Sequence, residues 1–124
     1  MYKIEKVWGF EEVWVNEPEY CFKILALKPG FTSSLHYHLK KKETFLVLKG
    51  YCYLEVWRGD QIETHKLVSE DKITILPGQP HRFFLKEEIG VGFGELVTQP
   101  CIIYEISTHH DDSDVVRKSE SRRI

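Results

Sequence analysis

The fold of this chain is limited most by its division into short runs of β-branched and aromatic residues, separated by turns rich in glycine, proline, asparagine and aspartate. Such runs cover residues 11–15, 20–28, 44–50, 51–57, 62–68, 72–76, 81–86 and 101–108. They recur at roughly 8–12-residue spacing, and no window of helical length keeps apolar residues at helical spacing. The sequence therefore predicts an all-β sandwich or barrel.

Length and charge narrow the function classes. The 124 residues suit one domain, and a net charge of −2 from 17 basic and 19 acidic residues gives no field that would gather nucleic acid or anionic lipid. No apolar run approaches the roughly 20 residues needed to cross a bilayer. The first residues, "MYKIEKVWGFEEVW", lack the pattern of a secretion signal, so we expect a cytoplasmic protein without nucleic-acid or membrane partners.

The chain divides into two parts by composition. We expect residues 1–108 to form the barrel and residues 109–124, "HHDDSDVVRKSESRRI", to form a polar tail. The tail has one apolar pair before its last residue, Val115-Val116, and is either a short docking segment or a loose end. A glycine-rich stretch separates the runs at 81–86 and 101–108.

Four side chains are placed to meet inside such a barrel. His36 and His38 are two residues apart, so on a strand they project from the same face. Glu43 shares its parity with the buried positions of the run that follows, and His81 comes after the "PGQP" turn with the same parity as its apolar neighbours. Three imidazoles and one carboxylate that converge form a site for Zn, Mn, Fe, Ni or Co, with one or two positions open for water or substrate.

The remaining histidines and cysteines are interpreted more simply. His65 lies on a polar strand and is expected at the surface, and His109-His110 precede "DDSD" in what is expected to be a solvated loop. The three cysteines form no Cys-x-x-Cys pair and lie among apolar residues, which indicates small buried thiols.

The ligand spacing resembles that of the cupin superfamily. The first cupin motif, G-x5-H-x-H-x4-E-x6-G, is complete from Gly30 to Gly50, whereas the second, G-x5-P-x-G-x2-H-x3-N, is matched only at Gly78 and His81. The resemblance covers about residues 7–107. It implies a single-domain double-stranded β-helix (jelly-roll) barrel, often a homodimer, with the metal near one mouth.

A closer resemblance is to the C-terminal isomerase domain of type II mannose-6-phosphate isomerases. The shared segments are "VWGFEEVW", "YCFKILALKPG", "ILPGQPHRF", "IIYEIS" and "SDVVR". The chain departs from that family at His36, where glutamine is usual, at Lys41, near the place of an arginine, and at Thr44, where a histidine is usual. The family's closing aromatic-glycine-arginine segment is also missing. The resemblance implies a metal-dependent aldose–ketose isomerase, and the departures widen its substrate to another sugar phosphate or a nucleotide sugar.

This reaction suggests roles for four further residues. Glu105, which shares parity with an apolar neighbour, is the candidate base, or else faces solvent. Lys23 is an interior general acid or phosphate ligand, or a side chain that extends to the rim. Arg82 binds a substrate phosphate or pairs with an acidic neighbour. Lys41, within "KKK", is part of a positive rim that binds substrate, or of a solvated turn.

Two other functions use the same barrel. A metal-dependent oxygenase or lyase would need the same His, His, Glu, His set, and a non-catalytic module would bind a sugar without regard to the metal. For quaternary structure we expect a homodimer, with the N-terminal strand "KVWGFEEVWV" available for strand exchange between subunits.

Overall fold

The computed structural model describes residues 1–88 and 98–124, so the glycine-rich stretch around Gly90–Gly94 lies outside the described residues. One 3₁₀ turn, η1 (Asp112–Asp114), is the only helical segment in the described part of the chain, and no described helix is long or apolar enough to span a membrane. The strands are β1 (Tyr2–Lys6), β2 (Gly9–Asn16), β3 (Cys21–Leu27), β4 (Phe31–Thr32), β5 (Leu35–His38), β6 (Glu43–Lys49), β7 (Tyr51–Arg58), β8 (Gln61–Val68), β9 (Lys72–Ile75), β10 (His81–Leu85), β11 (Cys101–Ser107), β12 (Val115–Ser119) and β13 (Arg122–Arg123).

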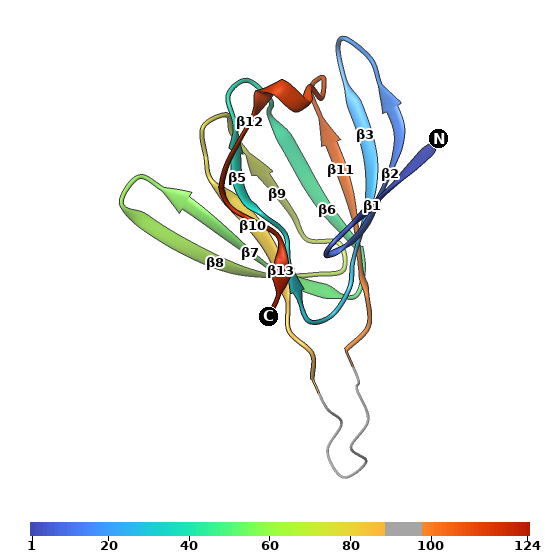
Figure 1. Ribbon diagram of the computed structural model, residues 1–124, viewed down its shortest axis with the longest axis vertical. Helices are drawn as coiled ribbons and strands as arrows, with labels where there is room; N and C mark the ends of the chain where they lie inside the picture. The colour runs from blue at the N-terminus through green and yellow to red at the C-terminus, as the bar shows by residue number, and fades with distance from the viewer. Residues whose placement is uncertain (89–97) are drawn as a thin grey trace.

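Two antiparallel sheets face each other and form the barrel (Figure 1). One sheet has the order β1-β2-β3-β11-β6-β9, and the other has β12-β5-β10-β4-β13, with the β7–β8 hairpin paired to β10. The predicted all-β jelly roll is confirmed. Because strands distant in sequence become neighbours, β3, β11 and β6 lie side by side and present alternate residues to one interior.

The interior is apolar through most of its length. Among the residues that the structure describes, thirteen buried ones form one core cluster, in which the rings of Phe45 and Phe83 meet edge to face with centroids 4.6 Å apart. The alternation along β7, where Cys52, Leu54 and Val56 are fully buried, is the period-two pattern expected of a strand with one face on the core. The three cysteines are unpaired and buried.

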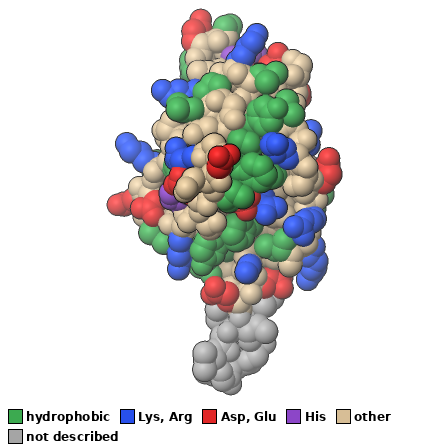
Figure 2. Space-filling model, turned by 90° about the vertical axis from the view of Figure 1, so that its left-hand side faces the viewer, with side chains coloured by type: hydrophobic (Ala, Val, Ile, Leu, Met, Phe, Trp, Pro, Cys, Tyr) green, Lys and Arg blue, Asp and Glu red, His purple; other side chains and the backbone are tan. Residues whose placement is uncertain are grey.

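The outer surface carries mixed charge. Figure 2 shows one face of the molecule, on which basic and acidic side chains are interspersed around exposed hydrophobic ones. This distribution agrees with the nearly balanced composition of the chain.

The C-terminal segment continues the second sheet. β12 pairs with β5 through Val115↔His38, Val116↔Tyr37 and Arg117↔His36, and β13 pairs with β4. Residues 109–124 were expected to be either a docking segment or a loose end, and in the structure they are docked against the barrel. The strand that carries two of the predicted metal ligands therefore has β12 on one side.

Gly9 brings the β1–β2 hairpin against β3. Its φ of +147° is a backbone conformation that glycine adopts readily and other residues rarely do. A Cβ atom there would also overlap the carbonyl oxygen of Ala26. The neighbouring carbonyl of Trp8 accepts a 2.8 Å hydrogen bond from the amide of Lys28, which fixes the close approach.

We expect Gly9→Ala to lower the free energy of unfolding by at least about 3 kcal/mol, since backbone strain adds to steric overlap. Gly59→Ala is the matched control, because Gly59 has φ +62° but open space around a Cβ, and it should cost about 1 kcal/mol. Urea denaturation of both variants measures the difference. Equal losses would contradict the packing argument.

Candidate metal centre

A cavity of about 310 Å³ opens between the two sheets. Strands β1, β2, β3, β5, β6, β10, β11 and β12 all contribute to its wall. Its polar lining includes Lys6, Glu11, Lys23, Ser34, His36, His38, Lys41, Glu43, His81, Glu105, His110, Asp112 and Arg117. Seven of the eight predicted metal, catalytic and substrate residues therefore line one cavity, and Arg82 is the exception.

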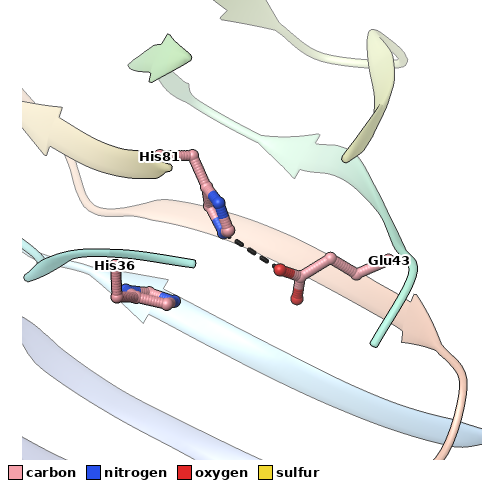
Figure 3. Close-up of side chains that lie close together, drawn as sticks. All are labelled: His36, Glu43 and His81. Atoms are coloured by element: carbon pink, nitrogen blue, oxygen red, sulfur yellow. Dashed lines mark ion pairs between the residues drawn. The ribbon is translucent and has the colours of Figure 1, made fainter. Parts of the chain in front are cut away.

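Three of the predicted metal ligands form a compact group. His36 on β5, Glu43 on β6 and His81 on β10 each offer one ligand atom, and these atoms all lie within 4.8 Å of one another. Figure 3 shows the three side chains, with Nε2 of His81 2.9 Å from Oε1 of Glu43. The β10–β5 pairing, His81↔His36, places the two imidazoles opposite each other.

Backbone carbonyls set the tautomers of two imidazoles. Nδ1 of His36 lies 3.0 Å from the carbonyl oxygen of Ser34, and Nδ1 of His81 lies 2.9 Å from that of Gln79. A carbonyl can only accept, so each contact favours the neutral ring with the proton on Nδ1; the hydroxyl of Ser34, also 3.0 Å from Nδ1 of His36, can accept as well as donate and is compatible with that form. Each Nε2 then keeps a lone pair, which is the form of histidine that binds a metal.

The facing atoms of the group lack hydrogen bonds. Oε1 of Glu43 and Nε2 of His81 are buried and have no hydrogen-bond partner with good geometry among the described residues, although they are 2.9 Å apart. Buried polar atoms are almost always satisfied, so an unsatisfied pair indicates a missing partner. Two lone-pair nitrogens and a carboxylate oxygen fit a divalent cation of the Zn, Mn, Fe, Ni or Co type, whose bonds to such atoms are about 2.0–2.2 Å long.

His38 lies at the edge of this group. Its Nε2 is 3.5 Å from Oε1 of Glu43, and its ring is buried. On the other side its Nδ1, which also has no hydrogen-bond partner in residues 1–88 and 98–124, faces Oδ2 of Asp114 at 3.7 Å. The structure thus brings the fourth predicted ligand next to the carboxylate, outside the compact trio.

The protonation states suit metal binding. Burial and the neighbouring imidazoles lower the pKa of His36 to about 3, and burial lowers the pKa of His38 to about 4. Burial would raise the pKa of Glu43, but the contact with His81 and the charge of Lys41 outweigh it and lower that pKa below its usual range. Neutral imidazoles and an ionised carboxylate are the forms that bind a metal without first losing protons.

A buried ion pair adjoins the candidate metal centre. Nζ of Lys41 is 2.6 Å from Oε2 of Glu105 and 3.5 Å from Oε2 of Glu43, and it also lies 3.0 Å from Nδ1 of His110. Burial would lower the pKa of Lys41, but the two carboxylates outweigh this and raise it, so the amine is charged. Lys41 is 3% exposed, so it belongs to the cavity and not to a solvated turn, and Glu105 faces inward.

Lys23 forms the second buried pair. Its Nζ lies 3.3 Å from Oε1 of Glu11, and both side chains are buried. Lys23 is also the cross-strand partner of Glu105 in the β3–β11 register. Of its two alternatives, the interior position is the one observed.

Arg82 does not reach the cavity. It follows His81 on β10 and points to the opposite face of the sheet, where its guanidinium hydrogen-bonds Glu55 at 3.0 and 3.3 Å. Of the two roles expected for Arg82, binding a substrate phosphate or pairing with an acidic neighbour, the structure has the second. Its partner is the acidic residue opposite it on β7.

Several polar residues of the cavity were not among the predicted site residues. Glu11 on β2 has the parity of the buried Val13, a signal that alternation alone could have given. His110, expected in a solvated loop, contacts Lys41, and Asp114 and Arg117 reach the site because β12 pairs with β5. Their placement depends on strand pairing between distant parts of the chain, which the sequence pattern does not show.

We expect His81→Ala and Glu43→Gln each to weaken Zn²⁺ or Co²⁺ binding more than about 100-fold, since loss of an outer-shell partner alone costs about 10–100-fold. Competition with a chromophoric chelator measures the dissociation constant. His65→Ala, on the outward β8 strand, is the matched control and should bind as the unchanged protein does. Wild-type affinity in His81→Ala would exclude this site.

The metal-free protein should lose stability as the pH falls from about 6.5 toward about 4. The pKa values of His36 and His38 are about 3 and about 4 in the folded chain, and an unfolded histidine has a pKa of about 6.5. In this window the unfolded chain binds more protons, so the free energy of unfolding decreases as the pH drops, and it is unaffected by these groups above pH 6.5. Denaturation midpoints between about pH 7.5 and about pH 5 measure the slope.

His36→Gln/His38→Gln should flatten this slope, whereas His65→Gln should keep it. The same slope in the double variant and the unchanged protein would mean that other groups cause the pH dependence.

The sequence itself has no match among protein-family models or curated proteins. Solved structures do match. A CapF crystal structure with the inhibitor 3-isopropenyl-tropolone superimposes with a TM-score of 0.74 at 18% identity, over 93% of this chain and 33% of that one. The capsular polysaccharide assembling protein CapF from Staphylococcus aureus gives 0.72 at 18% identity, over 99% of this chain and 31% of that one.

Oxalate decarboxylase from Bacillus subtilis at pH 4.6 gives a TM-score of 0.75 at 15% identity, over 94% of this chain and 30% of that one. The chain thus spans about a third of the length of these cupin-fold neighbours. At such identities the likeness shows the fold: together with the two facing sheets, it shows that this chain forms a jelly-roll β barrel like the one in these neighbours.

Proposed function

We propose that the protein is a metal-dependent isomerase that acts on a phosphorylated or nucleotide-linked sugar. One observation carries the proposal: a group of half-buried His36 and buried Glu43 and His81, the last two with unsatisfied ligand atoms, shares a 310 Å³ cavity with the buried Lys41–Glu105 ion pair. The first group suits a metal that binds sugar oxygens, and the second suits proton transfer beside it.

The metal would be held by His36, Glu43 and His81, with His38 as the fourth ligand. When bound, a divalent ion polarises the carbonyl and hydroxyl oxygens of a sugar and stabilises the negative charge that develops between them. The chain supplies the orientation of these ligands through the carbonyls of Ser34 and Gln79, which hold two of the imidazoles in one tautomer.

Glu105 is the proposed base. Its carboxylate removes the proton from the hydroxyl-bearing carbon and returns it to the former carbonyl carbon, while the hydroxyl proton passes to the former carbonyl oxygen, so that aldose and ketose interconvert with no net gain or loss of atoms. The charged amine of Lys41, 2.6 Å from Oε2, holds the carboxylate in place and can donate a hydrogen bond to a substrate oxygen. Lys23, next to Glu105 in the sheet and paired with Glu11, supports the charge balance of the cavity wall.

The anionic group of the substrate is assigned to the cavity mouth. Lys23 and Lys41 are already paired with carboxylates, and Arg82 lies on the outer face. Lys6 and Arg117 also line the cavity, and no ion pair to either is formed within residues 1–88 and 98–124. They are therefore the cations that remain for a phosphate or carboxylate.

The structural neighbours support the choice of substrates to test. One is described as a capsular polysaccharide assembling protein, which favours sugar-linked ligands. Others are oxalate decarboxylases, and this favours a metal-dependent lyase acting on a small acid as the second candidate function.

Turnover is best tested by NMR in deuterated water, with metal-stripped protein reloaded with Zn, Mn, Fe, Ni or Co in turn. The panel contains aldose and ketose phosphates, nucleotide sugars and oxalate. We expect metal-dependent interconversion of one sugar, with deuterium entering at the carbon next to the carbonyl. Glu105→Gln should lower kcat by at least about 100-fold, as expected when a general base is lost.

Glu55→Gln is the matched control, because Glu55 is also a strand glutamate paired with a cation but lies on the outer face, and it should keep full activity. Consumption of oxalate alone would favour the lyase. If protein that is fully loaded with metal converts none of these compounds, the result would argue against both enzyme functions and favour a sugar-binding module.

A further inference from the structure

Asp114 is the residue through which the C-terminal segment contacts the candidate metal centre. It lies at the junction of η1 and β12, and its side chain is 10% exposed. Its backbone carbonyl accepts a 3.0 Å hydrogen bond from the amide of Leu39. Oδ1 accepts from the amide of Lys40 at 2.9 Å, and Oδ2 accepts from the amide of Lys41 at 3.1 Å. One residue thus binds three successive amides of the turn between β5 and β6.

The same carboxylate faces His38. Oδ2 lies 3.7 Å from Nδ1 of His38, and within the described chain that buried nitrogen has no hydrogen-bond partner. A carboxylate attracts an N–H and repels a lone pair, so it favours the tautomer with the proton on Nδ1. Oε1 of Glu43 lies 3.5 Å from Nε2 and acts in the opposite sense, so Asp114 is the carboxylate that opposes a proton on Nε2 and keeps that lone pair available for a metal.

The turn that Asp114 binds also carries Lys41. The amide of this residue is held by Oδ2, and its side chain extends from there into the cavity to Glu105 and His110. A shift of the turn would therefore move Nζ away from Glu105. Two functional groups, one imidazole and one amine, depend on a single carboxylate outside the barrel's core.

We propose that Asp114 is a positioning residue that sets the tautomer of His38 and the location of Lys41, so that the docked C-terminal segment completes the site. The inference rests on the proposed function only in treating His38 as a metal ligand. Asp114 is neither part of the cavity lining nor a member of the trio, and it acts through His38 and the turn.

The test compares Asp114→Asn with Asp71→Asn. Asp71 is the matched control because its Oδ2 accepts a 2.8 Å hydrogen bond from the amide of Val68 in a turn that does not line the cavity. We expect Asp114→Asn to weaken Zn²⁺ binding about tenfold or more. It should also speed hydrogen exchange at the amides of Lys40 and Lys41. Asp71→Asn should bind Zn²⁺ within about twofold of the unchanged protein.

The tautomer of His38 is read directly in the unchanged protein. Long-range ¹H–¹⁵N spectra of metal-free protein at neutral pH should show the proton on Nδ1, and in Asp114→Asn a mixture of both tautomers. A proton on Nε2 in the unchanged protein would overturn the proposal, even if the variant failed to fold. So would unaltered Zn²⁺ affinity together with unaltered exchange at Lys40 and Lys41 in Asp114→Asn.

Failure of this proposal is distinguishable from failure of the proposed function. If the unchanged protein binds no metal, the metal centre is excluded, while the tautomer and the exchange rates still decide the role of Asp114. If it binds metal but turns over no sugar, the isomerase is excluded and the affinity comparison stands.

Discussion

The carboxylate of Glu43 is the group on which the rest of the site depends. At 2% exposure it is removed from water, a cost of several kcal/mol for an isolated charge. The cost is offset because His81, His38 and Lys41 all approach it within 3.5 Å. A bound cation would add the strongest of these contacts. Without Glu43, Lys41 would keep one carboxylate partner, and three imidazoles would face each other with nothing to balance a positive charge.

The barrel limits the desolvation cost of these buried charges by grouping the polar side chains in one part of an otherwise apolar interior. The ring of Phe45 lies 5.9 Å from that of His81 and 4.6 Å from that of Phe83, and both phenylalanines line the cavity, so the apolar core borders the polar groups directly. Charges that would be costly deep in the core are thereby grouped where they pair with each other. The low local dielectric strengthens those pairs and restricts each side chain to one geometry.

The alternation of residues within one strand was sufficient to predict the inward direction of Glu43 and His81, because side-chain direction in a strand is a local property. For Glu105 and Lys23 it left an inward and an outward or rim position open, and the structure has the inward one for both. It also indicated the all-β barrel. It could not place Lys41, which belongs to a turn, where the period of two is lost. Nor could it place His110 and Asp114, whose contacts depend on the pairing of β12 with β5 and of β11 with β6. For Arg82 the parity already directed the side chain away from the site, and of its two alternatives, a substrate phosphate or an acidic neighbour, the structure has the ion pair with Glu55.

The sequence separations within the site have a consequence for its assembly. Lys41 and Glu105 are 64 residues apart, and the turn amide of Lys41 and the carboxylate of Asp114 are 73 apart. Contacts of such long range form slowly, since a large loop must close before any of them is made. During synthesis on the ribosome, the chain would expose its three clustered histidines and Glu43 well before Glu105 and Asp114 emerge. A metal ion bound by the nascent chain would therefore meet the histidines and Glu43 before Glu105 and Asp114 are in place. The complete site forms only when β11 and β12 have joined the sheets.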